Sequence, residues 1–80
     1  MTRNYDPKDF AQDPGKYRLF KTAVTRSVII NENGHVDAGT VVGLTYLGVA
    51  RNQLYRRSEP IYKLTTGDVC YANGLTDFCL

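Results

Sequence analysis

The sequence predicts an all-β domain: a small, strongly bent antiparallel sheet or barrel of about five strands that follows an irregular N-terminal arm. From residue 17 onward, short runs of Val, Ile, Thr, Tyr and Leu alternate with Gly, Asn and Asp, a pattern typical of strands and turns. No segment repeats apolar residues at the spacing of an amphipathic helix over three turns. Turn residues recur about every eight to twelve positions, which favours several short strands.

Size and composition indicate one small folded domain. The chain has 80 residues, of which 42% are hydrophobic and 22% charged, and six Tyr and three Phe supply large contacts for a core. A domain of this size buries only part of its surface, so a deep enclosed active site is not expected. We expect residues 1–16 to form the arm and residues 17–80 to form a small β-barrel domain.

The predicted arm has no regular apolar period. Its two Asp-Pro dipeptides, Asp6-Pro7 and Asp13-Pro14, favour turns and extended backbone, which predicts a segment without regular structure. Aromatic contacts from Tyr5 and Phe10 would pin this arm to the domain. The alternative is a frayed terminus without a role.

The first half of the predicted domain contains one long strand and a hairpin. Residues 18–30 are consistent with a single long or bent strand, with a break expected near Thr25-Arg26. Asn33-Gly34 lies between extended runs, and it predicts a type I′ hairpin turn because both central residues of that turn need a positive φ.

The second half is predicted to contain the longest strand, at residues 40–50, in which Gly43 and Gly48 indicate bulges or sharp coiling. Pro60 interrupts a hydrogen-bonded ladder and predicts an edge or a kink. Shorter strands are expected at residues 53–58, 61–65 and 69–72. The residues expected in the core are Phe20, Val28, Ile30, Val42, Leu44, Leu47, Val49, Leu64 and Val69.

In the order of its elements, the sequence resembles the SH3-like barrels. The shared features are an extended opening segment, a long coiled strand, two hairpins and a one-turn connection, here Ala72-Asn73-Gly74-Leu75-Thr76-Asp77, before a short last strand. The resemblance covers about residues 17–80 and implies a small five-stranded barrel. The sequence has no Trp and no ALYDY-like segment, so the resemblance implies no peptide-binding specificity.

Side chains for chemistry are few, and their spacing does not predict an enzyme, a cofactor or a metal site. The single histidine, His35, directly follows the Asn33-Gly34 turn. Eight residues separate Cys70 from Cys79, which does not match the spacing of structural zinc ligands. The carboxylates fall mostly in turns or in the arm, and the glycines occur singly, without a phosphate-binding loop.

The two cysteines are predicted to be free thiols in a cytoplasmic protein. No secretory signal and no apolar run of about 18 residues occurs in the sequence, so no membrane association is expected. Two hairpin registers are possible for the last strands. A two-residue turn would place Cys70 opposite Asp77, whereas a four-residue loop would place it opposite Cys79 and allow a disulfide.

A basic, tyrosine-containing stretch is the strongest candidate for a functional surface. Residues 51–63 carry four cations and one acid, Glu59, whereas residues 64–80 carry two acids and no cation. Arginine and tyrosine suit recognition of phosphates, carboxylates and stacked partners, although charges and a proline also protect edge strands from aggregation. The predicted partner-binding residues are Arg51, Tyr55, Arg56, Arg57, Tyr62 and Lys63.

We therefore expect a non-enzymatic binding module that recognises an acidic partner through this basic hairpin. The preferred partner is a protein with an acidic or nucleic-acid-processing surface, because a net charge of only +2 is low for strong binding to duplex DNA. In size and style the chain resembles the small inhibitors or adaptors of phages and mobile elements, such as anti-CRISPR proteins. The alternatives are a nucleic-acid-binding β-barrel and a self-assembling structural subunit.

Overall fold

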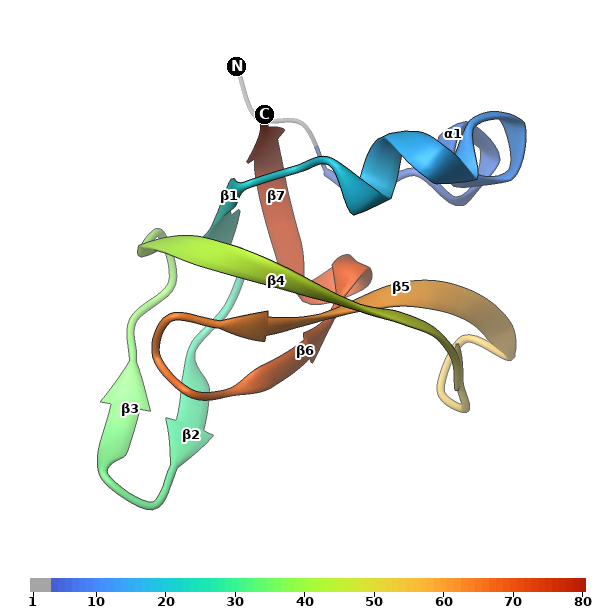
Figure 1. Cartoon of the computed structure of the whole chain (residues 1–80). Helices are drawn as coiled ribbons and strands as arrows, with labels where there is room; N and C mark the ends of the chain where they lie inside the picture. The colour runs from blue at the N-terminus through green and yellow to red at the C-terminus, as the bar shows by residue number, and fades with distance from the viewer. Residues whose placement is uncertain (1–3) are drawn as a thin grey trace.

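The computed structural model describes residues 4–80, and it confirms a mostly β chain built around a small, bent antiparallel sheet. In chain order the elements are α1 (Pro7–Gln12), the 3-10 helix η1 (Pro14–Arg18), β1 (Thr22–Thr25), β2 (Ile29–Asn31), β3 (Gly34–Val36), β4 (Val41–Asn52), β5 (Arg57–Leu64), β6 (Val69–Tyr71), the 3-10 helix η2 (Ala72–Gly74) and β7 (Leu75–Cys79). Figure 1 shows their arrangement.

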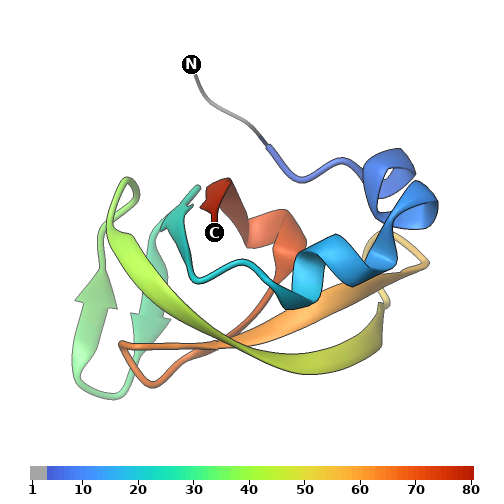
Figure 2. The same ribbon diagram turned by 45° about the horizontal axis from the view of Figure 1, so that its top comes forward.

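Five strands form one antiparallel sheet in the order β6-β5-β4-β1-β7. The long strand β4 curves strongly (Figure 2), and its first residues pair with β1 while the rest pairs with β5. Among the described residues, β6 and β7 are the two ends of this sheet and do not pair with each other. Hydrogen bonds therefore do not close the sheet into a barrel.

A bulge in β4 occurs at Gly48, one of the two glycines for which the sequence predicts a bulge or sharp coiling. The register with β5 shifts between Tyr46 and Gly48, which marks a bulge, and Gly48 has a φ of 124°, a conformation that side chains rarely adopt. Gly43 makes a close approach instead. Its N–H donates to Thr65 Oγ1 at 3.0 Å, and its carbonyl accepts from Thr65 N–H at 3.1 Å.

Replacement of Gly43 by Ala should therefore destabilise the fold. A Cβ at this position would lie 2.6 Å from Thr65 Cγ2, so the backbone or Thr65 must shift, at a cost of about 1–3 kcal/mol in the free energy of unfolding. Thr65→Ser removes the clashing methyl group and keeps the hydroxyl acceptor. Urea unfolding should show that the double variant recovers most of the loss; an unchanged midpoint for Gly43→Ala alone would contradict the packing.

The N-terminal segment is not irregular, which corrects the prediction for residues 4–16. Asp6 caps α1 by accepting from Lys8 N–H at 2.9 Å, and Pro7 occupies the first turn, where its missing N–H costs nothing. A helix of six residues is not stable alone, so packing must hold it. Tyr5 is buried, and Phe10 packs against the core, so the arm is docked. Residues 1–3 lie outside the described part.

The predicted strand at residues 18–30 is divided into two short strands. Residue 18 ends η1, β1 ends at Thr25, and β2 belongs to a separate two-stranded sheet. The expected break near Thr25-Arg26 is confirmed. Thr25 fixes this corner from a buried position: its Oγ1 donates to the Asp37 carbonyl at 2.8 Å and accepts from Thr40 N–H at 3.0 Å.

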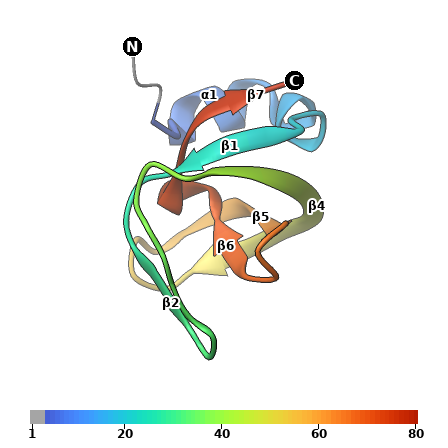
Figure 3. The same cartoon turned by 90° about the vertical axis from the view of Figure 1, so that its left-hand side faces the viewer.

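The β2–β3 hairpin forms where expected, but its predicted turn is wrong. Asn31 pairs with Gly34, so Glu32 and Asn33 are the two loop residues, and neither has a positive φ. Asn31 Oδ1 accepts from Asn33 N–H at 3.0 Å and stabilises the loop in another way. The hairpin extends away from the five-stranded sheet (Figure 3).

The predicted strand at residues 53–58 is also wrong, because residues 53–56 form the loop between β4 and β5. The strands expected at residues 61–65 and 69–72 correspond to the end of β5 and to β6. Pro60 lies inside β5, where it pairs with Val49, but β6 pairs with β5 only from Ile61 onward. The missing N–H of Pro60 thus falls on a stretch of β5 without a second neighbour.

The core is more aromatic than the sequence predicts. Val42 and Leu64 are buried and Phe20 and Leu44 pack against the core, as expected. The other five predicted core residues are 48–78% exposed, because β2 leaves the main sheet, β6 is an edge, and alternate residues of β4 face outward. These five are Val28, Ile30, Leu47, Val49 and Val69. Buried residues not predicted for the core include Tyr5, Tyr17, Ala23, Tyr62, Ala72 and Leu75.

Both cysteines are free thiols. Cys70 pairs with Tyr62 and Cys79 with Thr22, so neither of the two hairpin registers expected from the sequence occurs. Burial raises the pKa of the Cys70 thiol to about 11, and nearby Asp68 adds to the effect. Among residues 4–80, no helix is long and apolar enough to cross a membrane.

Candidate functional site

The basic stretch predicted from the sequence lies on the β4–β5 hairpin and its four-residue loop (Figure 1). Asn52 and Arg57 form the last pair of the ladder, and Arg51 pairs with Ser58 just before it. Tyr71 Oη donates to the Arg51 carbonyl at 3.0 Å, which links the outer end of β4 to β6. The stretch is therefore one continuous hairpin, but its side chains lie in different environments.

A buried carboxylate organises the base of the loop. Glu59 is fully buried, and its Oε2 accepts from Arg57 Nε at 2.9 Å and from Asn52 Nδ2 at 3.3 Å. Its Oε1 accepts from the backbone N–H of Asn73 at 3.1 Å. We call these four residues the Glu59 network. Sequence reasoning missed Glu59 as a structural residue, and the only signal for it was that it is the one acid among four cations.

Arg57 belongs to this network and is only partly available to a partner. Besides its ion pair with Glu59, its guanidinium lies 4.8 Å from the centroid of the Tyr55 ring and 5.7 Å from that of Tyr5. Such contacts favour a fixed guanidinium. The same arginine therefore joins the hairpin loop to the docked N-terminal segment.

Tyr62 cannot be a contact residue, which corrects the sequence-based assignment. Its side chain is completely buried, and its hydroxyl donates to the Tyr17 carbonyl at 2.7 Å. Burial raises the pKa of Tyr62, and nearby Tyr46 adds to the effect. Lys63 is exposed but lies five residues from Ser58 along β5, about 16 Å at the usual rise of a strand. The six predicted residues thus do not form one surface.

Several exposed residues lie at the loop end of the hairpin, and we call four of them the loop surface: Arg51, Leu54, Tyr55 and Arg56. Leu54 is 80% exposed, and Arg56 has a φ of 53°, a left-handed conformation that costs energy for a residue other than glycine. Beside the loop lies a shallow pocket of about 350 Å³. It is lined by Asn52, Leu54, Tyr55, Val69, Cys70, Tyr71, Asn73 and Gly74.

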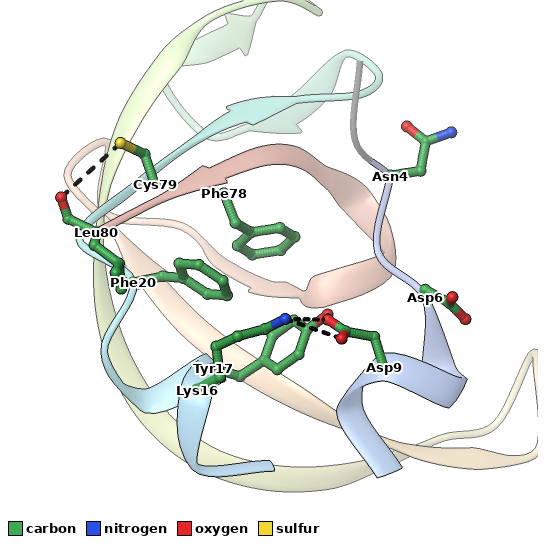
Figure 4. A pocket seen from close by; sticks show the side chains of 9 residues that line it. All are labelled: Asn4, Asp6, Asp9, Lys16, Tyr17, Phe20, Phe78, Cys79 and Leu80. Carbon is green, nitrogen blue, oxygen red and sulfur yellow. Dashed lines mark hydrogen bonds and ion pairs between the residues drawn. The ribbon is translucent and has the colours of Figure 1, made fainter. Parts of the chain in front are cut away.

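A second and larger pocket, of about 670 Å³, lies between the N-terminal helices and the end of β7 (Figure 4). We call it the aromatic pocket. The rings of Tyr17, Phe20 and Phe78 meet there with centroids 5.1–5.7 Å apart. The complete lining is Asn4, Asp6, Asp9, Lys16, Tyr17, Phe20, Phe78, Cys79 and Leu80.

An ion pair lies beside these rings. Lys16 Nζ lies 2.7 Å from Asp9 Oδ2 and 5.8 Å from the centroid of the Tyr17 ring. Tyr17 Oη donates to Asp9 Oδ2 at 2.8 Å. Burial raises the pKa of Tyr17, and the bond to Asp9 raises it further, so this hydroxyl remains a donor at neutral pH.

Within the described residues, no three His, Cys, Asp or Glu side chains form a group that could hold a metal ion. His35 contacts Asp37 at 3.0 Å, and both side chains are largely exposed. Comparison of the chain with protein-family models, with curated proteins and with solved structures gives no match. The geometry of the chain itself is therefore the basis for a functional proposal.

Proposed function

We propose that the protein is a non-enzymatic binding module whose loop surface recognises an acidic protein partner. The observation that carries the proposal is that a strained, exposed loop stands on a buried polar network. Asn52 uses both ends of its amide: Nδ2 donates to Glu59, while Oδ1 accepts from Leu54 N–H at 3.1 Å. The first turn of the loop is thereby fixed, and a fixed loop loses less conformational entropy on binding.

The composition of the loop surface favours a protein over a nucleic acid. Two cations, Arg51 and Arg56, lie on the same loop surface as the exposed side chains of Leu54 and Tyr55. Apolar and aromatic anchors beside arginine are typical of protein interfaces. Binding to a phosphate backbone gains most from several cations in a row, and this surface offers only two.

The proposal extends to the fold and the setting of the protein. The strand order β7-β1-β4-β5-β6, with η2 directly before the last strand, supports an SH3-like arrangement. Such a small cytoplasmic module would act as an inhibitor or adaptor in the style of those from phages and mobile elements. Binding alone would account for its effect, without a chemical step.

Reversal of both loop charges, Arg51→Glu with Arg56→Glu, should weaken partner binding well over tenfold. An interfacial arginine contributes about 2 kcal/mol, and reversal adds repulsion from an acidic partner. Arg57 is left unchanged because its loss would disturb the Glu59 network. Tagged protein should be used to capture the partner from a lysate of its host, and the affinity of the captured partner then measured with both forms.

A matched control changes the charge by the same amount elsewhere. Lys21 and Lys63 are exposed and lie far along the sheet from the loop, Lys21 next to the Thr22–Gly43 pair and Lys63 opposite Thr45, so Lys21→Glu with Lys63→Glu should bind like the wild type. Capture that survives nuclease treatment supports a protein partner, whereas capture lost with nuclease would favour nucleic acid. Wild-type affinity in a folded loop variant would contradict the proposal.

A further inference from the structure

The aromatic pocket combines partly exposed rings with the carboxylate of Asp9. Phe20 and Phe78 are each only partly buried, so part of their ring surface is open to a ligand. Of the two acidic residues in the lining, Asp9 lies beside the rings and is paired with Lys16, whereas the carboxylate of Asp6 points away from them (Figure 4) and caps α1. The faces of aromatic rings are themselves electronegative, so rings and carboxylates attract the same kind of ligand.

Lys16 already binds in the pocket in this way, as an ammonium group between a carboxylate and an aromatic ring. The ammonium of Lys16 is bound by Asp9 through contacts of 2.7 and 2.9 Å and faces the Tyr17 ring at 5.8 Å. Figure 4 shows this pair next to the rings of Tyr17, Phe20 and Phe78. The side chain of Lys16, a cation with an aliphatic stem, thus occupies one side of the pocket. The pocket volume of about 670 Å³ is large enough for a second group of this kind.

The backbone of β7 is strained where it supplies a ring to the pocket. Asp77 has a φ of 51°, and the register between β1 and β7 shifts between the pair Thr22–Cys79 and the pair Val24–Thr76. This irregularity brings Phe78 into contact with Tyr17 and Phe20. Local strain of this kind is frequent at binding sites, where it fixes the direction of a side chain.

We propose that the aromatic pocket is a binding site for an alkylammonium group, supplied either by a free amine or by a lysine side chain. The incoming ammonium meets the carboxylate of Asp9, in competition with Lys16, and the partly exposed rings of Phe20 and Phe78, while its alkyl stem covers apolar surface. This site is independent of the loop surface, because the two share no residue.

The probe is n-butylamine, which carries the same charged group and stem as a lysine side chain, and 1-butanol is its neutral analogue. Both are titrated into the full chain at pH 7, and the amide NMR signals of the pocket residues are followed. We expect n-butylammonium to bind about tenfold more tightly than 1-butanol, because cation–π and charge interactions act only on the cation. Equal affinities would overturn the proposal.

Two charge variants have opposite expected effects. Asp9→Asn keeps an oxygen that can accept from Tyr17 Oη but removes the charge, and it should weaken n-butylammonium binding about threefold. Lys16→Ala removes the competing ammonium and should strengthen binding by at least about threefold. Asp13→Asn is the matched control, because Asp13 is exposed in the same segment and does not line the pocket.

The source of the ammonium group is distinguished by a third ligand, the tripeptide Gly-Lys-Gly. Binding as tight as that of n-butylamine would assign the site to a polypeptide side chain, and weaker binding would assign it to a free amine. Either result supports the site if the charge variants behave as described. Folded Lys16→Ala protein that binds n-butylammonium no better than the wild type would overturn the proposal.

Discussion

Replacement of Glu59 by Ala is expected to destabilise the protein by about 3–5 kcal/mol, which is a large part of the total stability of an 80-residue domain. The carboxylate is fully buried and accepts from three donors, on Asn52, Arg57 and Asn73. Its removal leaves these donors without an acceptor. The partly buried guanidinium of Arg57 would also lose its counter-charge.

The measurement is urea unfolding followed by circular dichroism. Glu59→Gln separates charge from shape, because the amide keeps one oxygen acceptor but places an NH₂ group against other donors. We expect an intermediate loss for this variant. Glu32→Ala is the control, because Glu32 is exposed in the β2–β3 turn and should change stability by less than about 0.5 kcal/mol. If Glu59→Ala changed the free energy of unfolding by as little as this control does, the Glu59 network would not stabilise the fold.

The main sheet could be predicted because its signals are local. The β-branched and aromatic residues of β4, with Gly48 at the bulge, indicate a long coiled strand without reference to the rest of the chain. The sequence wrongly predicts a strand in place of the loop at residues 53–56, because Tyr55 is favourable in strands and Arg56 gives no sign of its left-handed conformation. The loop is fixed by the pairing of Asn52 with Arg57, which is a contact between two strands and cannot be predicted from local sequence.

The candidate sites could be predicted only in part, because they depend on residues far apart in sequence. The cluster of cations at residues 51–63 predicts Arg51 and Arg56 as partner-binding residues, and both are exposed. The burial of Glu59 depends on Asn73, fourteen positions away, whose backbone N–H needs an acceptor. The aromatic pocket brings together Tyr17 and Phe78 from opposite ends of the chain, and no local sequence pattern predicts that contact.

The second large effect is expected at Tyr62, where Tyr62→Ala should cost about 3–5 kcal/mol in the free energy of unfolding. The ring is completely buried and contacts those of Tyr46 and Phe78, with centroids 5.9 Å away in each case. Removal of the ring would leave a cavity in the centre of the core. A cavity of this kind is costly because close-packed neighbours relax only partially.

Tyr62→Phe tests the hydroxyl separately. It keeps the ring but leaves the buried Tyr17 carbonyl without the donor that contacts it at 2.7 Å, so a loss of about 1–2 kcal/mol is expected. The variant should also change the response to alkali. Burial raises the pKa of Tyr62 above its ordinary value of 10.0, so the unfolded chain releases this proton at lower pH than the folded one. The contribution of the protonated Tyr62 hydroxyl to the free energy of unfolding is complete below pH 10 and is lost as the pH rises further.

Unfolding at pH 7 and at pH 10.5 therefore distinguishes a core residue from a contact residue. If Tyr62 is part of the core, Tyr62→Phe lowers stability at pH 7 and loses less on going to pH 10.5 than the wild type does. The alkaline loss should not disappear, because burial also raises the pKa of Tyr5, to about 12, and that of Tyr17. If Tyr62 instead contacted a partner, Tyr62→Phe would weaken binding and leave both unfolding curves unchanged.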